Sequence, residues 1–277
     1  MGVLAVAALG WVFFRPQPAD ANQRLFQGVS YHREARQSPR PLVIHVVKVD
    51  LRQPDISFLV TPANQEGETP LRARTTSRFL DDFNLQVAIN GSGFTPWRSN
   101  TLLDYYPHTG DPIGPTGLAA SKGNVYSQAV EGAPVLYISR TNQARFNTPS
   151  GRVYNAISGN VMLLEQGSIQ PEPGGDLQPR TAVGLDRSGR TLILVVVDGR
   201  QPGYSQGVTL AELAQILLEN GAFTAMNLDG GGSSTLVSKA ANGRAKVLNS
   251  PIDQRIPGRE RPVGNHLGIY ADNLNRP

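Results

Sequence analysis

The chain has 277 residues, no cysteine, and 26 basic against 22 acidic side chains, for a formal charge of +4. This length suits one large domain or two small ones, and the lack of cysteine excludes disulfides, thiol nucleophiles and thiolate zinc sites. The basic residues are scattered rather than gathered in runs, so we expect no nucleic-acid partner. The 29 glycines and 21 prolines predict a turn-rich globular fold.

The chain opens with an almost wholly apolar stretch, residues 1–14, which is followed by the polar residues 15–30. This stretch is short for a membrane span of about 20 residues and suits the apolar part of a signal segment, although no basic residues precede it. We expect an export signal or anchor at 1–14, a linker at 15–30 and the main domain at 31–277. A buried N-terminal element is the alternative for the apolar stretch. The expected location is periplasmic, extracellular or anchored in the cell envelope, with membrane association through this segment only.

The first half of the domain has mainly strand-like patterns. Residues 41–51 and 55–62 alternate in hydrophobicity and predict a hairpin or a tight strand pair. Residues 69–83 have helical spacing, and residues 85–90 predict a strand that ends at Asn90. The long Gly-, Pro- and Asn-rich stretch that follows predicts loops and short strands, which often line sites.

Residues 180–237 have the clearest pattern. Two strands around the turn at 187–190 are followed by a helix, in which Thr209 and Glu212 have the form of a capping box. A second buried strand ends at Asp229, so residues 191–229 predict a β-α-β crossover between parallel strands. The predicted fold class is α/β, or mixed α+β: a single domain with a large mixed β-sheet core and loop-rich decorations.

Asp198 and Asp229 each close one of these two strands. Parallel strands point the same way, so both carboxylates are expected at one edge of the sheet, on the order of 5 to 10 Å apart if the strands are adjacent. Paired carboxylates at such a spacing suit the cleavage of a glycosidic bond. The alternative is that each aspartate only starts an Asp-Gly turn.

Three glycines, Gly230 to Gly232, follow Asp229 and precede Ser233. Such a segment is favoured where a ligand approaches the main chain, and with the hydroxyl residues it predicts a nest for an anionic oxygen; a plain tight turn is the alternative. Arg180 offers a fork of donors suited to phosphate, unless it is a solvated surface arginine. The histidines lack zinc-site spacing. Oxygen ligands for calcium or magnesium are present but lack a recognised spacing, so no metal or other cofactor is expected.

Several patches together resemble one family, the phosphodiester glycosidases, which are named for N-acetylglucosamine-1-phosphodiester alpha-N-acetylglucosaminidase and include bacterial exopolysaccharide-biosynthesis-type relatives. The resemblance covers residues 85–270. Two departures from the family pattern stand out: the loop after Asn90 reads NGSGF where the family has NGGFF, and His266 stands where a small residue is commoner. The patches that carry the resemblance are NGSGF (90–94), RTAVG (180–184), VDGR (197–200), the segment from Gly207 through the helix at 212–214, NLDGGGSS (227–234) and RPVGNHLGIY (261–270).

The resemblance implies hydrolysis of the bond between an anomeric carbon and a phosphodiester oxygen, in a phosphorylated glycan or a GlcNAc-1-phosphodiester-like substrate of the cell envelope or of exopolysaccharide metabolism. Arg180 would hold the phosphate, and Asp229 and Asp198 would act as acid, base or nucleophile. The expected substrate-binding residues are Asn90, Gly91, Thr181, Asn227, Gly230, Gly231, Gly232, Ser233 and Asn265. Two alternatives remain: a non-catalytic glycan-binding or polysaccharide-assembly factor, and a metal-dependent phosphodiesterase that releases sugar-1-phosphate.

Overall fold

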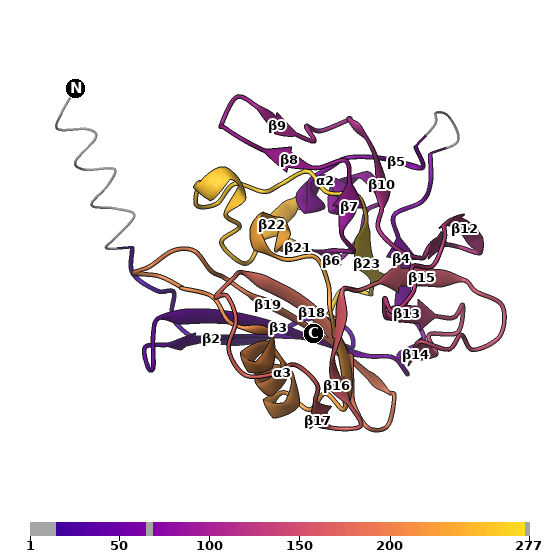
Figure 1. Ribbon diagram of the computed structural model, residues 1–277. Coiled ribbons are helices and arrows are strands. Elements are labelled where there is room, and N and C mark those ends of the chain that lie inside the picture. The colour runs from indigo at the N-terminus through magenta and orange to yellow at the C-terminus, as the bar shows by residue number, and fades with distance from the viewer. Residues whose placement is uncertain (1–14, 65–68, 275–277) are drawn as a thin grey trace.

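Antiparallel sheets dominate the protein, and the largest of them has eight strands. The computed structural model describes residues 15–64 and 69–274, and Figure 1 shows this main sheet crossing the lower half of the molecule. All neighbouring strands in it are antiparallel. In spatial order they are β1 (Ala21–Phe26), β2 (Val29–Arg36), β3 (Leu42–Asp50), β19 (Thr191–Val197), β18 (Arg180–Leu185), β20 (Thr224–Asn227), β16 (Val161–Glu165) and β17 (Ser168–Ile169).

A second sheet lies above the main sheet in Figure 1. Its strands are β22 (Ala245–Val247), β21 (Leu236–Lys239), β6 (Val87–Asn90), β23 (His266–Tyr270) and β4 (Ser57–Val60). A side sheet holds β12 (Asn124–Ser127), β11 (Ala119–Ser121), β15 (Asn155–Ser158), β13 (Val135–Ile138) and β14 (Ala144–Phe146). Short strands complete the upper part: β5 (Leu71–Arg72), β10 (Pro112–Pro115) and β7 (Phe94–Thr95) in one sheet, and β8 (Arg98–Ser99) with β9 (Tyr105–Tyr106) in another.

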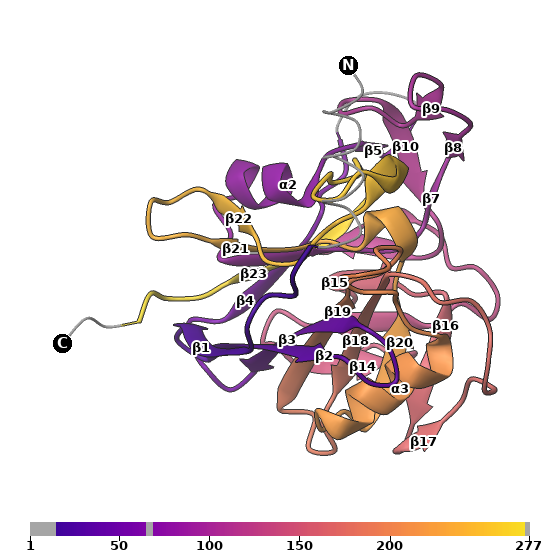
Figure 2. The same ribbon diagram turned by 90° about the vertical axis from the view of Figure 1, so that its left-hand side faces the viewer.

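The core is layered because successive side chains of a strand face opposite sides of its sheet. In β3, Val47 and Val49 belong to the apolar cluster shared with the second sheet, whereas Ile44 and Val46 pack with helix α3 (Leu210–Glu219). Helix α2 (Thr76–Asp82) covers the other face of the second sheet, and Figure 2 shows the two helices on opposite outer sides of the sheets. The four layers of helix, sheet, sheet and helix form one domain, which confirms the mixed α+β class.

The segment from β18 to β20 has the predicted elements with a different pairing. β18 and β19 form a hairpin, and the capping box of Thr209 and Glu212 begins α3. β19 and β20 are parallel to each other, as a crossover requires, but they are not adjacent. β18 lies between them and pairs antiparallel with both. The predicted crossover between parallel strands is therefore present, but its two strands are not adjacent, because the local hairpin places β18 between them.

Three further predictions need correction. Residues 41–51 and 55–62 contain β3 and β4, but these strands belong to different sheets and pair with β19 and β23 instead of with each other. The linker expected at 15–30 contains β1 and the start of β2, an edge hairpin that is polar because much of it faces solvent while Phe26 and Val29 are buried. The helix expected over 69–83 is limited to α2, with β5 ahead of it.

The apolar stretch at 1–14, expected to be a signal or anchor, lies outside the described residues. Within residues 15–64 and 69–274, no helix has the length and apolar character needed to cross a membrane.

Candidate active site

The triple glycine lies where β20 leaves the main sheet. β20 ends at Asn227, and a 3₁₀ turn, η1 (Gly231–Ser233), begins four residues later. Two backbone hydrogen bonds tie this segment to β18: the Leu228 amide donates to the Thr181 carbonyl at 2.8 Å, and the Gly231 amide donates to the Pro179 carbonyl at 2.8 Å. These two hydrogen bonds therefore fix the main chain on both sides of Asp229.

Each of the three glycines lies against an arginine. A methyl group on Gly231 would lie 3.1 Å from Nη2 of Arg200, and one on Gly232 would lie 2.8 Å from Cζ of Arg261. A methyl group on Gly230 would meet the Pro179 carbonyl at 3.0 Å and Cδ of Arg180 at 3.8 Å. Side chains on Gly231 and Gly232 would displace Arg200 and Arg261, whereas one on Gly230 would crowd the Pro179 carbonyl. The absence of these side chains lets a ligand reach both guanidinium groups and main chain.

Asp229 is only half-buried and is tied through its main chain. Its amide donates to the Gly91 carbonyl at 3.0 Å, its carbonyl accepts from Nδ2 of Asn90 at 2.7 Å, and its Oδ1 accepts the Gly230 amide at 3.0 Å. Removal from water raises the pKa of Asp229, whereas Ser233, Arg261 and the Gly230 amide act in the opposite direction. Burial has the larger effect, so the carboxylate is more basic than an ordinary aspartate.

Asn90 and Thr181 join the two sheets beneath Asp229. Both are fully buried, and Oδ1 of Asn90 accepts hydrogen bonds from the Thr181 hydroxyl at 2.8 Å and from the Thr235 amide at 3.1 Å. Together with the bond from Asn90 Nδ2 to the Asp229 carbonyl, they fix the position of Asp229. The structure therefore places both predicted residues at the site, but their side chains are hydrogen-bonded to other protein groups, whereas contacts with substrate were expected.

Asn265 and Gly91 form a second joint in the same region. Oδ1 of Asn265 accepts from the amide of Ser92 at 2.8 Å and from its hydroxyl at 2.9 Å, and the Gly91 amide donates to the Asn265 carbonyl at 2.9 Å. A methyl group on Gly91 would lie 2.8 Å from that carbonyl oxygen, so only glycine fits. This close approach fixes the loop whose sequence departs from the family pattern.

Three buried polar atoms around the triple glycine have no hydrogen-bond partner among the described residues. They are Oδ1 of Asn227, Oγ of Ser234 and Oγ1 of Thr235. Buried polar atoms are nearly always satisfied by protein, water or ligand, so their clustering here marks a polar site.

Asp198 has an environment unlike that of Asp229. Its side chain is fully buried, and its oxygens contact Nε2 of His45 at 3.2 Å, Nδ2 of Asn249 at 3.0 Å and the amide of Ser250 at 2.8 Å. Nδ1 of His45 contacts the hydroxyl of Tyr31 at 2.9 Å. Because the carboxylate is enclosed by protein donors, it is neither an exposed turn starter nor open to substrate.

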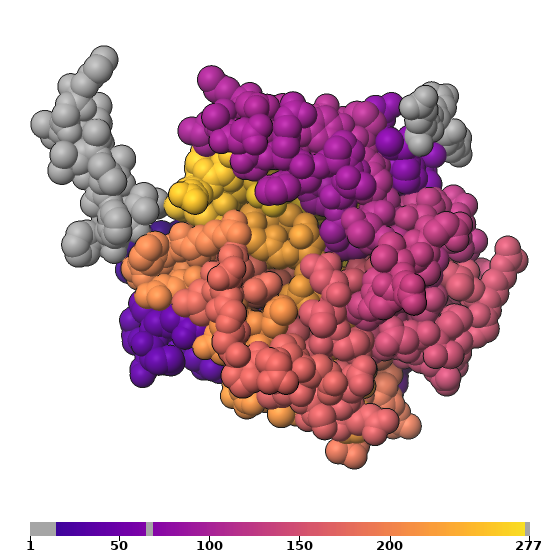
Figure 3. Space-filling view, viewed as in Figure 1, coloured from indigo at the N-terminus to yellow at the C-terminus, as the bar shows by residue number. Residues whose placement is uncertain are grey.

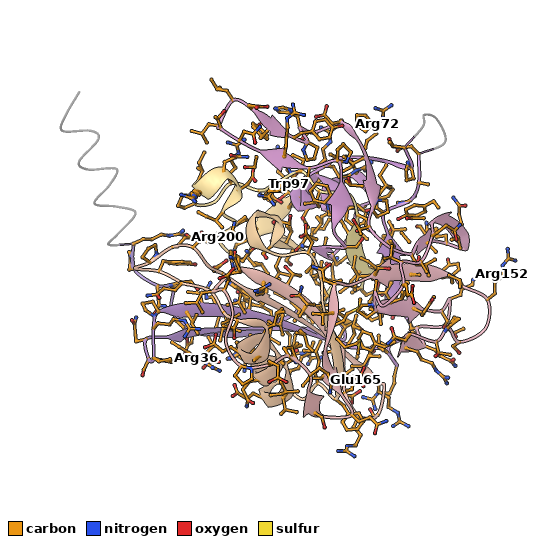
Figure 4. The ribbon with its side chains drawn as sticks, in the orientation of Figure 1. Arg36, Arg72, Trp97, Arg152, Glu165 and Arg200 are labelled. Atoms are coloured by element: carbon orange, nitrogen blue, oxygen red, sulfur yellow. The ribbon has the colours of Figure 1, made fainter. Side chains whose placement is uncertain are left out.

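A cleft of about 860 Å³ shares two arginines, Arg200 and Arg261, with the triple glycine, whereas Asp229 and the glycines themselves do not line it. It lies between the β7–β8 segment, the loop after β19 and the turn η2 (Asp253–Arg255). Figure 3 shows the purple segments at the top of the molecule meeting the orange and yellow segments on this face. Figure 4 places Trp97 on its upper side and Arg200 on its lower side. The other lining residues are Ser99, Asn100, Thr101, Leu102, Leu177, Gln178, Ile252, Gln254, Arg255 and Arg261.

Sequence reasoning missed Arg200 and Arg261, which line both the cleft and the glycine segment. Arg261 is fixed by Asp253, whose buried carboxylate accepts from Nε at 2.8 Å, and its Nη1 donates to the Ser233 hydroxyl at 3.3 Å. Arg180, the arginine that was predicted, donates to the carbonyls of Val208 and Asp176. Three successive glycines were a signal that bulky groups crowd the main chain, but they did not identify which groups.

His266 belongs to the core of the second sheet. His266 is fully buried, stacks on Phe79 with 4.6 Å between ring centroids, and contacts the Thr61 hydroxyl through Nδ1 at 3.0 Å. Burial lowers the pKa of His266 to about 3, with a smaller effect of Arg74 in the same direction, so the ring is neutral. Within the described part of the chain no three His, Cys, Asp or Glu side chains gather as a metal site would require.

The fold and the site thus define a layered α+β protein with an arginine-lined cleft beside a basic carboxylate. The family model described as phosphodiester glycosidase matches residues 83–270. This match covers more than half of the chain, which therefore belongs to the phosphodiester glycosidase family.

Individual relatives cover different parts of the protein. Bovine N-acetylglucosamine-1-phosphodiester alpha-N-acetylglucosaminidase is 48% identical over 99 residues, which are 29% of this chain and 18% of that enzyme. An uncharacterized SPbeta prophage-derived protein of Bacillus subtilis is 32% identical over 205 residues, 67% of this chain and 28% of that protein. The matches therefore span less than a third of these curated relatives.

Two solved structures share the fold over most of the chain. The zebrafish N-acetylglucosamine-1-phosphodiester alpha-N-acetylglucosaminidase catalytic domain has a TM-score of 0.61 at 23% identity, covering 94% of this chain and 92% of that one. A hypothetical protein from Synechocystis has a TM-score of 0.66 at 16% identity, covering 92% and 64% of the two chains. At these identities the likeness shows the fold alone.

Proposed function

We propose that the protein hydrolyses the glycosidic bond of a sugar-1-phosphodiester of the GlcNAc-1-phosphodiester type. The observation that carries the proposal is the alignment of three glycines with Arg180, Arg200 and Arg261 beside Asp229. Guanidinium groups and open main-chain amides suit a phosphate, and the neighbouring carboxylate suits attack at the carbon attached to it. Family membership and the name of the bovine relative support the same substrate class.

In this proposal Asp229 works in its ionised form. The departing group is a phosphate monoester, which leaves readily at neutral pH, so protonation of the leaving oxygen contributes little and a base or nucleophile contributes most. Burial makes Asp229 a stronger base, while Arg261 and Ser233 stabilise its charge. The bond between the anomeric carbon and the phosphate oxygen breaks, the hydroxyl of water ends on the sugar, and the remaining phosphate leaves as a monoester with the other proton released to solvent.

The arginines hold the phosphate during this step. Arg200 and Arg261 approach the triple glycine from the cleft, and Arg180 approaches from β18. Their charges stabilise the phosphate as it gains negative charge on departure.

Asp198 is assigned a positioning role. Its Oδ1 accepts from Nδ2 of Asn249, which also donates to the Ser234 carbonyl at 3.0 Å, two residues after the triple glycine. Asn90, Thr181 and Asn265 hold the neighbouring loops in the same way. Asn227, with its unpartnered Oδ1, is the buried amide we assign to a substrate hydroxyl, which would donate to that oxygen.

The decisive experiment is hydrolysis of a defined alpha-GlcNAc-1-phosphodiester in ¹⁸O-labelled water. Glycosidic cleavage releases free GlcNAc carrying the label and an unlabelled phosphate monoester. Release of sugar-1-phosphate, or label in phosphate, would instead establish the phosphodiesterase alternative. Addition of EDTA is expected to leave the rate unchanged, and loss of activity restored by a divalent cation would contradict this scheme.

A non-catalytic glycan-binding role is the second alternative. An isolated protein that binds the substrate but releases no product over a wide pH range would favour it.

We also propose that the substrate belongs to the cell envelope or to an exported polysaccharide, and that the protein acts outside the cytoplasm. The apolar sequence at 1–14 supports this location. Fusion of residues 1–30 to a reporter that is active only after export tests it, since a cytoplasmic, inactive reporter would exclude export through this segment.

A further inference from the structure

The cleft carries more positive charge than one phosphodiester requires. Arg200, Arg255 and Arg261 line it, and no acidic side chain of residues 15–64 or 69–274 does. Arg261 has the carboxylate of Asp253, but the one described side chain that holds the Arg200 guanidinium is the neutral amide of Gln178, with Nε of Arg200 donating to its oxygen at 2.8 Å. Burial lowers the pKa of Arg200, and the positive charges of Arg261 and Arg255 lower it further. The three arginines therefore repel one another in the absence of an anionic ligand.

Arg255 is the member of this set that the triple glycine does not explain. It is exposed, and its guanidinium has no hydrogen-bond or ion-pair partner among the described residues. Both Arg255 and the preceding Gln254 have left-handed backbones, with φ of 60° and 52°. Residues other than glycine rarely adopt this backbone conformation, and such strain is concentrated at functional sites.

The turn η2 is fixed on both sides, so it holds Arg255 at the wall of the cleft. Asp253 binds Arg261 beneath the turn, and the side-chain Nε2 of Gln254 donates to the Ser99 hydroxyl of β8 at 3.0 Å. An arginine on a mobile surface loop would not require either of these two contacts. The turn thus holds the backbone of Arg255 at the wall of the cleft that Arg200 and Arg261 also line.

The remaining surface of the cleft suits the uncharged carbon skeleton of a ligand that carries an anionic group at each end. Trp97 is half exposed and lies opposite Arg200, with the Arg261 guanidinium 5.3 Å from its ring centroid. Leu102 and Leu177 add apolar surface near neutral polar groups. The volume of about 860 Å³ is at the upper end of the roughly 300 to 1,000 Å³ that is usual for small-molecule sites.

We propose that the cleft binds two phosphates of one ligand: the scissile one at Arg200 and Arg261, and a second, on the leaving-group side, at Arg255. The substrate class is therefore a glycan or polyol chain with a phosphodiester in successive repeat units, and Trp97 contacts the unit between the charges. The reaction on this chain rests on the function proposed above, whereas the binding of two phosphates does not.

The kinetic test compares two synthetic sugar-1-phosphodiesters, one with a neutral alkyl leaving group and one whose leaving group carries a second phosphodiester. Wild-type kcat/KM is expected to be about tenfold higher for the second substrate, and salt is expected to reduce this advantage. Arg255→Gln removes the advantage. Arg152→Gln, an exposed arginine remote from the cleft in Figure 4, retains it. Equal rates on both substrates, or equal loss on both in Arg255→Gln, would overturn the proposal.

The binding test uses tripolyphosphate and titration calorimetry on the intact protein. Arg255→Gln is expected to raise the dissociation constant about tenfold, and Arg152→Gln is expected to leave it within twofold of wild type. If the protein hydrolyses neither substrate but Arg255→Gln still weakens tripolyphosphate binding, the proposed reaction fails and the two-phosphate site stands. If Arg255→Gln binds tripolyphosphate like wild type, the two-phosphate site fails, whatever the enzyme hydrolyses.

Discussion

Asp198-Gly199 and Asp229-Gly230 are the same dipeptide at the ends of two parallel strands of one sheet, and their surroundings give them different roles. Asp198 is enclosed by His45, Asn249 and the Ser250 amide. Asp229 is half-buried and followed by glycines that leave room for arginines. A carboxylate whose oxygens are all held by protein stabilises the fold, whereas one with a raised pKa beside cationic groups is poised to react.

The largest effect is expected from Asp229→Asn, because it removes the carboxylate that we propose to be the base or nucleophile. Activity should fall roughly 10²- to 10⁴-fold. Stability at pH 7 should hold or rise: the native pKa of Asp229 is raised, so the stability linked to its protonated form is present below its ordinary pKa and lost as the pH rises through the native value. Initial rates and thermal melts measure both, with Asp186→Asn at the other end of the β18–β19 hairpin as control. Wild-type activity in Asp229→Asn would remove Asp229 from the mechanism.

Asp198→Ala should act on stability instead of chemistry. Removing one partner of a buried charged network costs roughly 3 to 5 kcal/mol of unfolding free energy, because the remaining donors are left unsatisfied. Urea unfolding measures this, and Asp50→Ala, in an exposed pair with Arg52, should have a much smaller effect. Activity per folded molecule should fall less than tenfold. A loss as large as that of Asp229→Asn, in protein that remains folded, would return Asp198 to the catalytic step.

Gly232→Ala tests the glycine side of the comparison. The added methyl group would lie 2.8 Å from Cζ of Arg261 and must displace it, which costs roughly 1 to 3 kcal/mol if the surroundings do not adjust. We expect a higher KM and a lower kcat, measured by steady-state kinetics. Gly93→Ala is the control, because its methyl group would meet Thr116 at an ordinary 3.7 Å. Unchanged kinetics in Gly232→Ala would show that Arg261 does not need this position.

The smallest effect is expected from Ser233→Ala, as a shift in pH dependence. Ser233 lowers the pKa of Asp229, so its loss should raise that pKa further. Because Asp229 works ionised, activity should rise with pH through its pKa, and this limb should move to higher pH in the variant. The kcat/KM profile measures the shift, with Ser188→Ala, on a surface turn, as control. A kcat/KM that falls as the pH rises through this pKa would instead indicate that Asp229 acts as a general acid.

Much of the fold was predictable wherever the signal is local. The capping box of Thr209 and Glu212, the β18–β19 hairpin and the strand ending at Asn90 all follow from short-range patterns. Pairing was not predictable, since β3 and β4 are neighbours in the chain yet find their partners in β19 and β23. The polar edge strand β1 was taken for linker because an exposed edge strand has little apolar alternation to reveal it.

For the candidate site, the sequence by itself determined the place: a carboxylate and three glycines at the end of a buried strand, within the residues that the family model matches. Only the tertiary structure decided which groups surround them. Arg200 and Arg261 reach the glycines, and His45 and Asn249 enclose Asp198, through contacts between residues far apart in the chain. The physical reason is that a strand and its turn are specified by neighbouring residues, whereas burial, charge balance and access depend on whatever the rest of the chain packs against them.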